Sequence, residues 1–172
     1  MKNDLTESQD YDIRYTRLTD ISYLKNWLID PRVMAFMPFD YTQAQEIENF
    51  CKNFIGFSKY NACLTATYQS KPIGLGVLYL MPYKKVSHLA MLQIIVDPIW
   101  QRNNVGFSLL KNLKHQACEY FKLDSIHCEI MHDHPAMNLL KKSDFYEVFR
   151  QEGFYKVQSD YKARVVMECK LK

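Results

Sequence analysis

A short polar turn is the part of the sequence whose residue types and spacing suggest chemistry. It reads Gln101-Arg102-Asn103-Asn104-Val105-Gly106, and it lies between the apolar run Ile94-Ile95-Val96 and a long stretch with helical spacing. The first backbone N–H groups of a helix lack partners within the helix, and the helix dipole adds partial positive charge beside them. Such a helix start suits a phosphate or pyrophosphate, to which Arg102 can add a charge-assisted contact. The turn is therefore predicted to bind an anion.

Three other groupings look like functional motifs but favour structural explanations. The trio His132-Asp133-His134 has alternate spacing and no second ligand cluster, so we predict no metal site. The pair Gly74-x-Gly76 lies inside an apolar strand pattern without a following helix, which argues against a dinucleotide-binding loop. The five cysteines are scattered and form no CxxC pair, which is typical of reduced thiols in a cytoplasmic protein.

The composition is that of a globular domain with no sign of nucleic-acid or membrane binding. Of 172 residues, 48% are apolar and 24% are charged, and the net charge of +3 comes without a long Lys/Arg run. No apolar run approaches the roughly 20 residues of a membrane span, and residues 1–10 contain no apolar signal segment. We expect a cytoplasmic protein with a flexible leader over 1–10 and one domain over 11–172.

Hydrophobic periodicity predicts the elements that must position the turn. Strands are expected over 11–18, 62–68, 73–81, 88–96, 125–131, 145–151 and 163–171. Helices are expected from the N-cap Thr19-Asp20 to Leu28, from Thr42 to Ile55, over 105–121 and over 135–142. Asp30-Pro31 should end the first helix, and Thr42 and Gln45 have the spacing of a capping box for the second.

The order of these elements predicts an α/β fold of the mixed α+β kind. Several strands in a row, followed by a strand-helix-strand unit, favour a central mixed, largely antiparallel sheet of about seven strands with about four helices on its faces. The segment from Met34 to Tyr41 is aromatic and irregular, so it can either cover a substrate or pack onto the core.

The polar turn resembles motif A of the GNAT N-acetyltransferase superfamily, whose pattern is Gln/Arg-x-x-Gly-x-Gly/Ala. Gln101 and Gly106 match this pattern, whereas Asn104 stands in place of the first glycine. Asparagine is one of the few non-glycine residues that readily accept a positive φ, so Asn104 can replace the glycine without backbone strain. The family's strand ending in Val-x-Pro, here Val96-Asp97-Pro98, and its following helix both flank the turn.

The resemblance extends over most of the chain. The segments that carry it are Ile13 to Asp20, Trp27, Asp30 to Val33, Lys71 to Gly74, Asp133 to Leu140, and Asp144-Phe145. The first three resemble the branch that acetylates protein N-termini, polyamines and aminoglycosides, and the last two resemble motif B. Within motif B, Asp133 replaces the usual asparagine, Leu140 replaces a tyrosine that often protonates the departing thiolate, and Asp144 replaces a glycine.

The resemblance implies an N-acetyltransferase that moves an acetyl group from acetyl-CoA to a primary amine by direct attack, without a metal. The acceptor would be a peptide N-terminus, a polyamine or another small amine. The residues assigned to acetyl-CoA are Ile95, Val96, Gln101, Arg102, Asn103, Asn104, Val105, Gly106, Phe107, Asp133 and Leu140. Gln93 occupies a strand position where an acid often sits, and Tyr146 or Tyr155 are candidates to protonate the thiolate.

Other hypotheses of function remain open at this point. The residues at positions 140 and 93 also suit a catalytically weak module that binds or senses acyl-CoA on the same fold. A third class is a protein-interaction domain without a cofactor. The sequence does not identify the acceptor amine, and it does not distinguish a monomer from a homodimer.

Overall fold

Seven strands form one mixed sheet in the computed structural model, which describes residues 11–40 and 43–172. The strands are β1 (Asp12–Tyr15), β2 (Cys63–Tyr68), β3 (Lys71–Leu80), β4 (Leu89–Val96), β5 (Ser125–Met131), β6 (Tyr146–Val157) and β7 (Asp160–Lys170). Their order is β1-β2-β3-β4-β5-β7-β6, and only the central pair β4 and β5 is parallel. The sheet is therefore mixed and largely antiparallel, as predicted.

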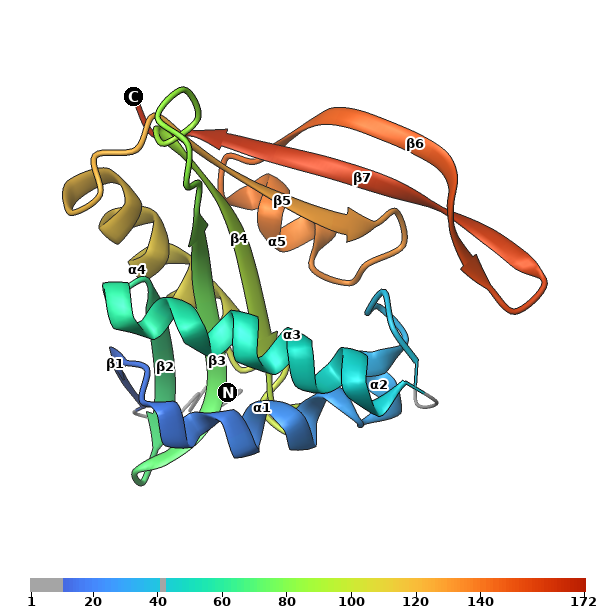
Figure 1. Cartoon of the computed structure of the whole chain (residues 1–172), viewed down its shortest axis with the longest axis horizontal. Helices are drawn as coiled ribbons and strands as arrows, with labels where there is room; N and C mark the ends of the chain where they lie inside the picture. The colour runs from blue at the N-terminus through green and yellow to red at the C-terminus, as the bar shows by residue number, and fades with distance from the viewer. Residues whose placement is uncertain (1–10, 41–42) are drawn as a thin grey trace, which may run out of the picture.

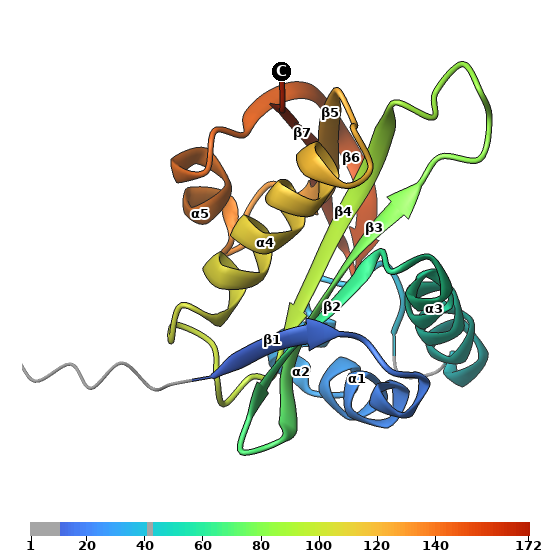
Figure 2. The ribbon, with the colours of Figure 1, turned by 90° about the vertical axis from the view of Figure 1, so that its left-hand side faces the viewer.

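Helices cover both faces of the sheet (Figure 2). The α-helices are α1 (Ile21–Leu28), α2 (Pro31–Met34), α3 (Ala44–Gly56), α4 (Val105–Glu119) and α5 (Met137–Lys142), with short 3-10 helices η1 (Leu18–Asp20) and η2 (Phe57–Tyr60). Helices α1 and α3 lie on one face, and α4 and α5 lie on the other (Figure 2). None of the helices within the described ranges is long and apolar enough to cross a membrane.

Each face of the sheet has its own apolar core. On one face, Leu24 and Leu28 of α1 and Phe54 of α3 are fully buried against Leu75 of β3. On the other face, the buried stripe of α4 packs on the sheet through Val105, Leu109, Leu110 and Leu113. These stripes have the helical spacing of apolar side chains that face a core.

Two glycines of β3 set how closely α4 approaches the sheet. A Cβ added at Gly76 would lie 2.5 Å from Leu113 Cδ1, and one added at Gly74 would lie 3.0 Å from Val105 Cγ1. A Cβ at either position would require these side chains to shift, so the glycines allow α4 to pack closely on β3.

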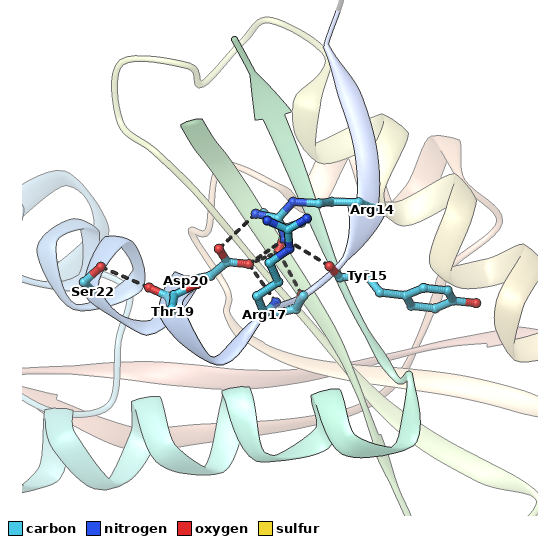
Figure 3. A network of polar contacts seen from close by, with 8 residues as sticks. Arg14, Tyr15, Arg17, Thr19, Asp20 and Ser22 are labelled. Atoms are coloured by element: carbon cyan, nitrogen blue, oxygen red, sulfur yellow. Dashed lines mark hydrogen bonds and ion pairs between the residues drawn. The ribbon is translucent and has the colours of Figure 1, made fainter. Parts of the chain in front are cut away.

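A buried carboxylate ties the start of the chain to the sheet (Figure 3). Asp20 accepts hydrogen bonds from Arg14 Nη1 (2.8 Å) and Nη2 (3.0 Å), from the Arg17 backbone N–H (2.9 Å) and from Thr65 Oγ1 (3.0 Å). Burial alone would raise the pKa of Asp20, but these hydrogen bonds outweigh it and lower the pKa. The carboxylate does not cap α1, as the sequence suggested; it turns back to close η1 and to join β1 to β2.

The predicted element order is confirmed, with one additional α-helix and with different ends for several elements. The strand predicted over 11–18 ends at Tyr15, and Leu18 begins η1. A fifth α-helix, α2, begins directly after the first helix, because Pro31 suits a first helical turn and Asp30 accepts a hydrogen bond from the Arg32 N–H (2.9 Å). Strand β3 begins at Lys71, because Gln69 and Ser70 both have positive φ and form a tight hairpin turn.

Two further differences concern the C-terminal elements. Strand β6 continues to Val157 and strand β7 already begins at Asp160, so the two strands form one long hairpin, with register shifts in β6. The last helix, α5, begins at Met137 and leaves Pro135 in the preceding turn. The leader over 1–10 and the capping role of Thr42 lie outside the described residues.

Candidate functional site

The two parallel strands at the centre of the sheet separate along their length. Strands β4 and β5 pair over only three positions, Leu89 with Ser125, Ala90 with Ile126, and Met91 with His127. Beyond Met91 the strands diverge, and Figure 1 shows them starting side by side and ending far apart. The second half of β4 therefore has a strand neighbour, β3, on one side only.

Backbone alternation identifies which groups of β4 face the resulting gap. Asp97 N–H donates to Ile73 C=O (3.0 Å), so the backbone groups of every second residue before it, Ile95 and Gln93, also point at β3. The backbone groups of Ile94 and Val96 then point toward β5 and have no strand to pair with there. This edge offers N–H donors and C=O acceptors to an extended ligand.

The polar turn lies at the end of this free edge. Residues Gln101 to Asn104 are exposed. Asn104, which stands in place of a glycine in the motif, has φ 60° and ψ 4°, a left-handed conformation. Gln101 Nε2 reaches back to Val96 C=O (3.4 Å), and the first helical hydrogen bond of α4 joins Ser108 N–H to Asn104 C=O (2.9 Å).

Three N–H groups at the start of α4 are left without protein partners. Val105, Gly106 and Phe107 precede the first helical hydrogen bond, and their N–H groups have no acceptor in the part of the chain that the structure describes. Arg102, also with positive φ (67°), is exposed beside them. Unpaired donors at a helix start, together with an arginine, are what a pyrophosphate needs.

Gly106 faces the space between β4 and α5. A Cβ added at Gly106 would meet only Val96 Cγ2 (3.7 Å) and Leu139 Cδ2 (3.8 Å), both at ordinary contact distance. Leu139, which the sequence did not single out, therefore borders the site. Its neighbour Leu140 is buried in the core and is 6% exposed. The α-helical period could have separated the two leucines, since adjacent helical residues differ by about 100° in direction.

On the opposite face of β4, Gln93 projects toward the helices α1 and α3. It shares this face with Val77 and Ile95, which belong to the core beneath those helices. Tyr79 donates its hydroxyl hydrogen to Gln93 Oε1 (3.0 Å), and burial raises the pKa of Tyr79. Gln93 lies just past the last paired position of β4 and β5, so it lies next to the start of the gap.

The tyrosines proposed as proton donors both lie on β6, the edge strand of the sheet. Tyr146 lies on β6, the edge strand, and donates a hydrogen bond to Glu168 Oε2 (2.8 Å) of β7. That hydrogen bond raises the pKa of Tyr146. Tyr155 also lies on β6, where burial raises its pKa. Two strands, β5 and β7, separate both tyrosines from β4.

A contact between two loops joins the segment after α2 to the segment after β5. Phe36, after α2, packs edge-on against His134, after β5, with ring centroids 4.9 Å apart. Lys162 Nζ lies 5.9 Å from the centre of the Phe36 ring and forms an ion pair with Asp133 (2.6 Å). The aromatic segment that follows α2 thus has two roles. Met37 and Phe39 are buried in the core, whereas Phe36 contacts His134 after β5.

The same loop contains both histidines of the sequence trio, and His134 has a structural role there. Burial lowers the pKa of His134 to about 4, and its Nδ1 accepts a hydrogen bond from the Ala136 N–H (3.0 Å). Within residues 11–40 and 43–172, no three His, Cys, Asp or Glu side chains are placed to hold a metal ion.

The stability of the protein is expected to fall from pH 7 to pH 5 partly because of His134. The folded pKa lies below the unfolded value of about 6.5, so only the unfolded chain takes up this proton and stability is lost as the pH falls. The loss at pH 5 is about 2 kcal/mol. His134→Asn, which keeps an acceptor for Ala136, should remove this part of the pH dependence in urea unfolding at the two pH values.

Replacement of an exposed histidine, His88→Asn, is the matched control and should leave the pH dependence as in the wild type. Equal losses of stability in the wild type and in His134→Asn would contradict the assignment.

Burial makes three of the five cysteines poor nucleophiles. All five are free, and burial raises the pKa of Cys51 to about 11 and those of Cys63 and Cys128 to about 12. A thiol at these pKa values is protonated at neutral pH and reacts poorly.

Comparison with known proteins is consistent with this geometry. A family model described as an acetyltransferase (GNAT) domain matches residues 12–145. The search of curated proteins gave no significant match.

Solved structures share the fold over nearly their whole length. A Salmonella typhimurium protein described as an acetyltransferase, solved with its cofactor acetyl-CoA, is 13% identical, with 95% of each chain covered and a TM-score of 0.79. The Escherichia coli ribosomal-protein-S18-alanine N-acetyltransferase is 18% identical, with 95% of each chain covered and a TM-score of 0.68. A spermidine N-acetyltransferase chimera from Vibrio cholerae and hSSAT is 17% identical, covering 94% of this chain and 95% of the other, with a TM-score of 0.75.

Proposed function

The chain belongs to the GNAT acetyltransferase family, and from this membership we propose that it transfers an acetyl group from acetyl-CoA to a primary amine. The observation that carries the proposal is the start of α4, where three unpaired N–H groups and Arg102 adjoin the free edge of β4. A similar fold has been solved with acetyl-CoA bound. The site lies where an anion and an extended chain can be bound together.

Each part of acetyl-CoA has a matching surface in the proposal. The pyrophosphate binds the turn from Gln101 to Phe107, where Gly106 leaves room between β4 and α5. The pantetheine chain pairs with the backbone of Ile94 and Val96, like an added strand. The thioester then lies where β4 and β5 begin to diverge, beside Gln93.

The reaction proposed is a direct attack by the amine. The amine nitrogen forms a bond to the acetyl carbon, the carbon–sulfur bond breaks, and its electron pair leaves with the sulfur. The proton that the nitrogen loses passes through water to the thiolate. A backbone N–H on the β5 side of β4 would polarise the carbonyl oxygen, and positioning of the two substrates would supply much of the rate.

A second candidate is a module that binds acyl-CoA with little or no turnover. It is favoured by the nature of the side chains beside the gap: Gln93 cannot take up a proton, and Leu140 is buried in the core. The two candidates share the binding site and differ in whether an acceptor reacts.

Acetyl-CoA is expected to raise the melting temperature of the protein. At a concentration of one hundred times the Kd, a ligand that binds only the folded state adds about 2.7 kcal/mol of stability, or about 5 to 10 °C for a chain of this size. Differential scanning fluorimetry with acetyl-CoA, and with adenosine as a control lacking the pyrophosphate, measures this shift. The absence of any shift at millimolar acetyl-CoA would exclude both candidates.

Release of free thiol from acetyl-CoA then separates the two candidates. The assay uses peptide amides, spermidine and an aminoglycoside as acceptors. Thiol release with any of them supports the transferase, whereas a thermal shift without release supports the binding module.

A further inference from the structure

The hydrogen bond between Tyr79 and Gln93 decides which end of the Gln93 amide faces the proposed acceptor. A carboxamide has an oxygen that accepts and a nitrogen that donates. Tyr79 donates to Gln93 Oε1 at 3.0 Å, which occupies the accepting end. Gln93 Nε2 has no acceptor in the described part of the chain, so its two N–H groups are free to donate to a bound acceptor.

Tyr79 is held in place well enough to perform this role. Its ring packs edge-on against Phe54 (centroids 6.2 Å apart) and Phe57 (5.2 Å apart), at interplanar angles of 84° and 82°. Burial raises the pKa of Tyr79, so the hydroxyl keeps its hydrogen at all ordinary pH values. The hydroxyl is thus a fixed donor rather than a mobile one.

We propose that Tyr79 is a positioning residue that turns the N–H groups of Gln93 toward the acceptor, and that the acceptor is an amine with a carbonyl group attached to its amine-bearing carbon. This inference rests on the proposed acetyl transfer. An amino-acid amide or a peptide N-terminus has such a carbonyl, two bonds from the nitrogen, and can accept from Gln93. Spermidine has only methylene groups there, and its ammonium groups would face the positive end of the amide dipole.

The charged residues on the β5 side of the gap also favour a peptide-like amine over a polyamine. Glu129 and Asp133 are the carboxylates at the diverging end of β5, and each already has a basic partner. Arg164 lies 3.2 Å from Glu129, and Lys162 lies 2.6 Å from Asp133. A polyamine would need a free carboxylate to bind its second ammonium group, and these two are neutralised.

Proton chemistry also favours this class of acceptor. The α-amino group of a peptide has a pKa of about 8, so an appreciable fraction is neutral at pH 7.5. Polyamine nitrogens are more basic and need a group that takes up their proton, which Gln93 cannot do. A site that presents amide N–H groups is therefore suited to an amine that needs no strong base.

The test compares two small amines of similar basicity that differ in the carbonyl. Glycinamide has a carbonyl next to the amine-bearing carbon, and propargylamine has an alkyne instead. We expect kcat/KM for glycinamide to exceed that for propargylamine by about tenfold, the effect of one good hydrogen bond. Tyr79→Phe keeps the packed ring and should reduce this ratio to near one, mainly through KM for glycinamide.

The control variant is Tyr120→Phe, which removes an exposed hydroxyl at the end of α4 and should leave the ratio unchanged. Gln93→Glu removes both N–H groups and adds a base. It should lose the preference for glycinamide and gain activity toward spermidine, with a rate that rises with pH through the carboxyl pKa.

Other results would overturn the inference without touching the proposed function. A wild type that uses propargylamine or spermidine as well as glycinamide, or an unchanged ratio in Tyr79→Phe, would contradict it. For a protein that binds acetyl-CoA without turnover, calorimetric binding of the same amines in the presence of CoA gives the same comparison. Failure of the proposed function itself appears separately, as a missing thermal shift with acetyl-CoA.

Discussion

Gly106→Trp is expected to abolish the rise in melting temperature that acetyl-CoA produces, while the variant remains folded. The new side chain fills the space between Val96 and Leu139 and covers the unpaired N–H groups at the start of α4. Loss of two hydrogen bonds to a charged pyrophosphate weakens binding by at least about one hundredfold. The fold should tolerate the change, because position 106 is half-exposed and lies in a helix without positive φ.

Two controls make this result specific. Gly106→Ala adds only a methyl group at ordinary contact distance, so a large part of the thermal shift should remain. Gly56→Trp places the same bulk at the end of α3, where an added Cβ meets nothing within 4 Å, and the shift should be unchanged. If Gly106→Trp binds acetyl-CoA like the wild type, the pyrophosphate does not bind at this turn.

Asp20→Ala is expected to destabilise the protein by about 3 to 5 kcal/mol, the usual effect of breaking a buried ion pair. Arg14 loses its partner, and the Arg17 N–H and the Thr65 hydroxyl lose a buried acceptor (Figure 3). The folded pKa of Asp20 is lowered, so its contribution is complete at pH 7 and is lost only as the pH falls through that pKa. Urea unfolding at pH 7 measures the difference directly.

The matched control is Glu147→Ala, which breaks an exposed ion pair with Arg150 (2.8 Å) on β6. Exposed pairs of this kind contribute less than about 1 kcal/mol. A loss for Asp20→Ala no larger than that of the control would mean that the buried network does not join the start of the chain to the sheet.

The element order and the place of the turn before α4 could be predicted because both follow from local sequence patterns. The apolar spacing of α1 and α4 indicates which face each helix buries, and Asn104 stands directly before α4, where the backbone has a positive φ. The family resemblance rested on the same segment, and the match over residues 12–145 confirms it.

The rest depends on contacts between segments that are distant in sequence. No local pattern could show that Tyr79 donates to Gln93 on the neighbouring strand, or that Phe36 meets His134. The long β6–β7 hairpin was underestimated because Gly153, with φ 64°, and the register shifts of β6 interrupt the alternation of side chains. Tyr146 was a candidate by residue type alone, and its place on the edge strand follows from the sheet order.

The three-position pairing of β4 with β5 has a consequence for how the sheet is held together. The sheet consists of an N-terminal part, β1 to β4, and a C-terminal part, β5 to β7, each made of antiparallel neighbours. Few backbone hydrogen bonds join the two parts, which are held together mainly by the shared apolar core on the α4 face. A ligand chain laid along β4 and contacting α5 would span this seam. Acetyl-CoA would therefore add contacts between the two parts of the sheet.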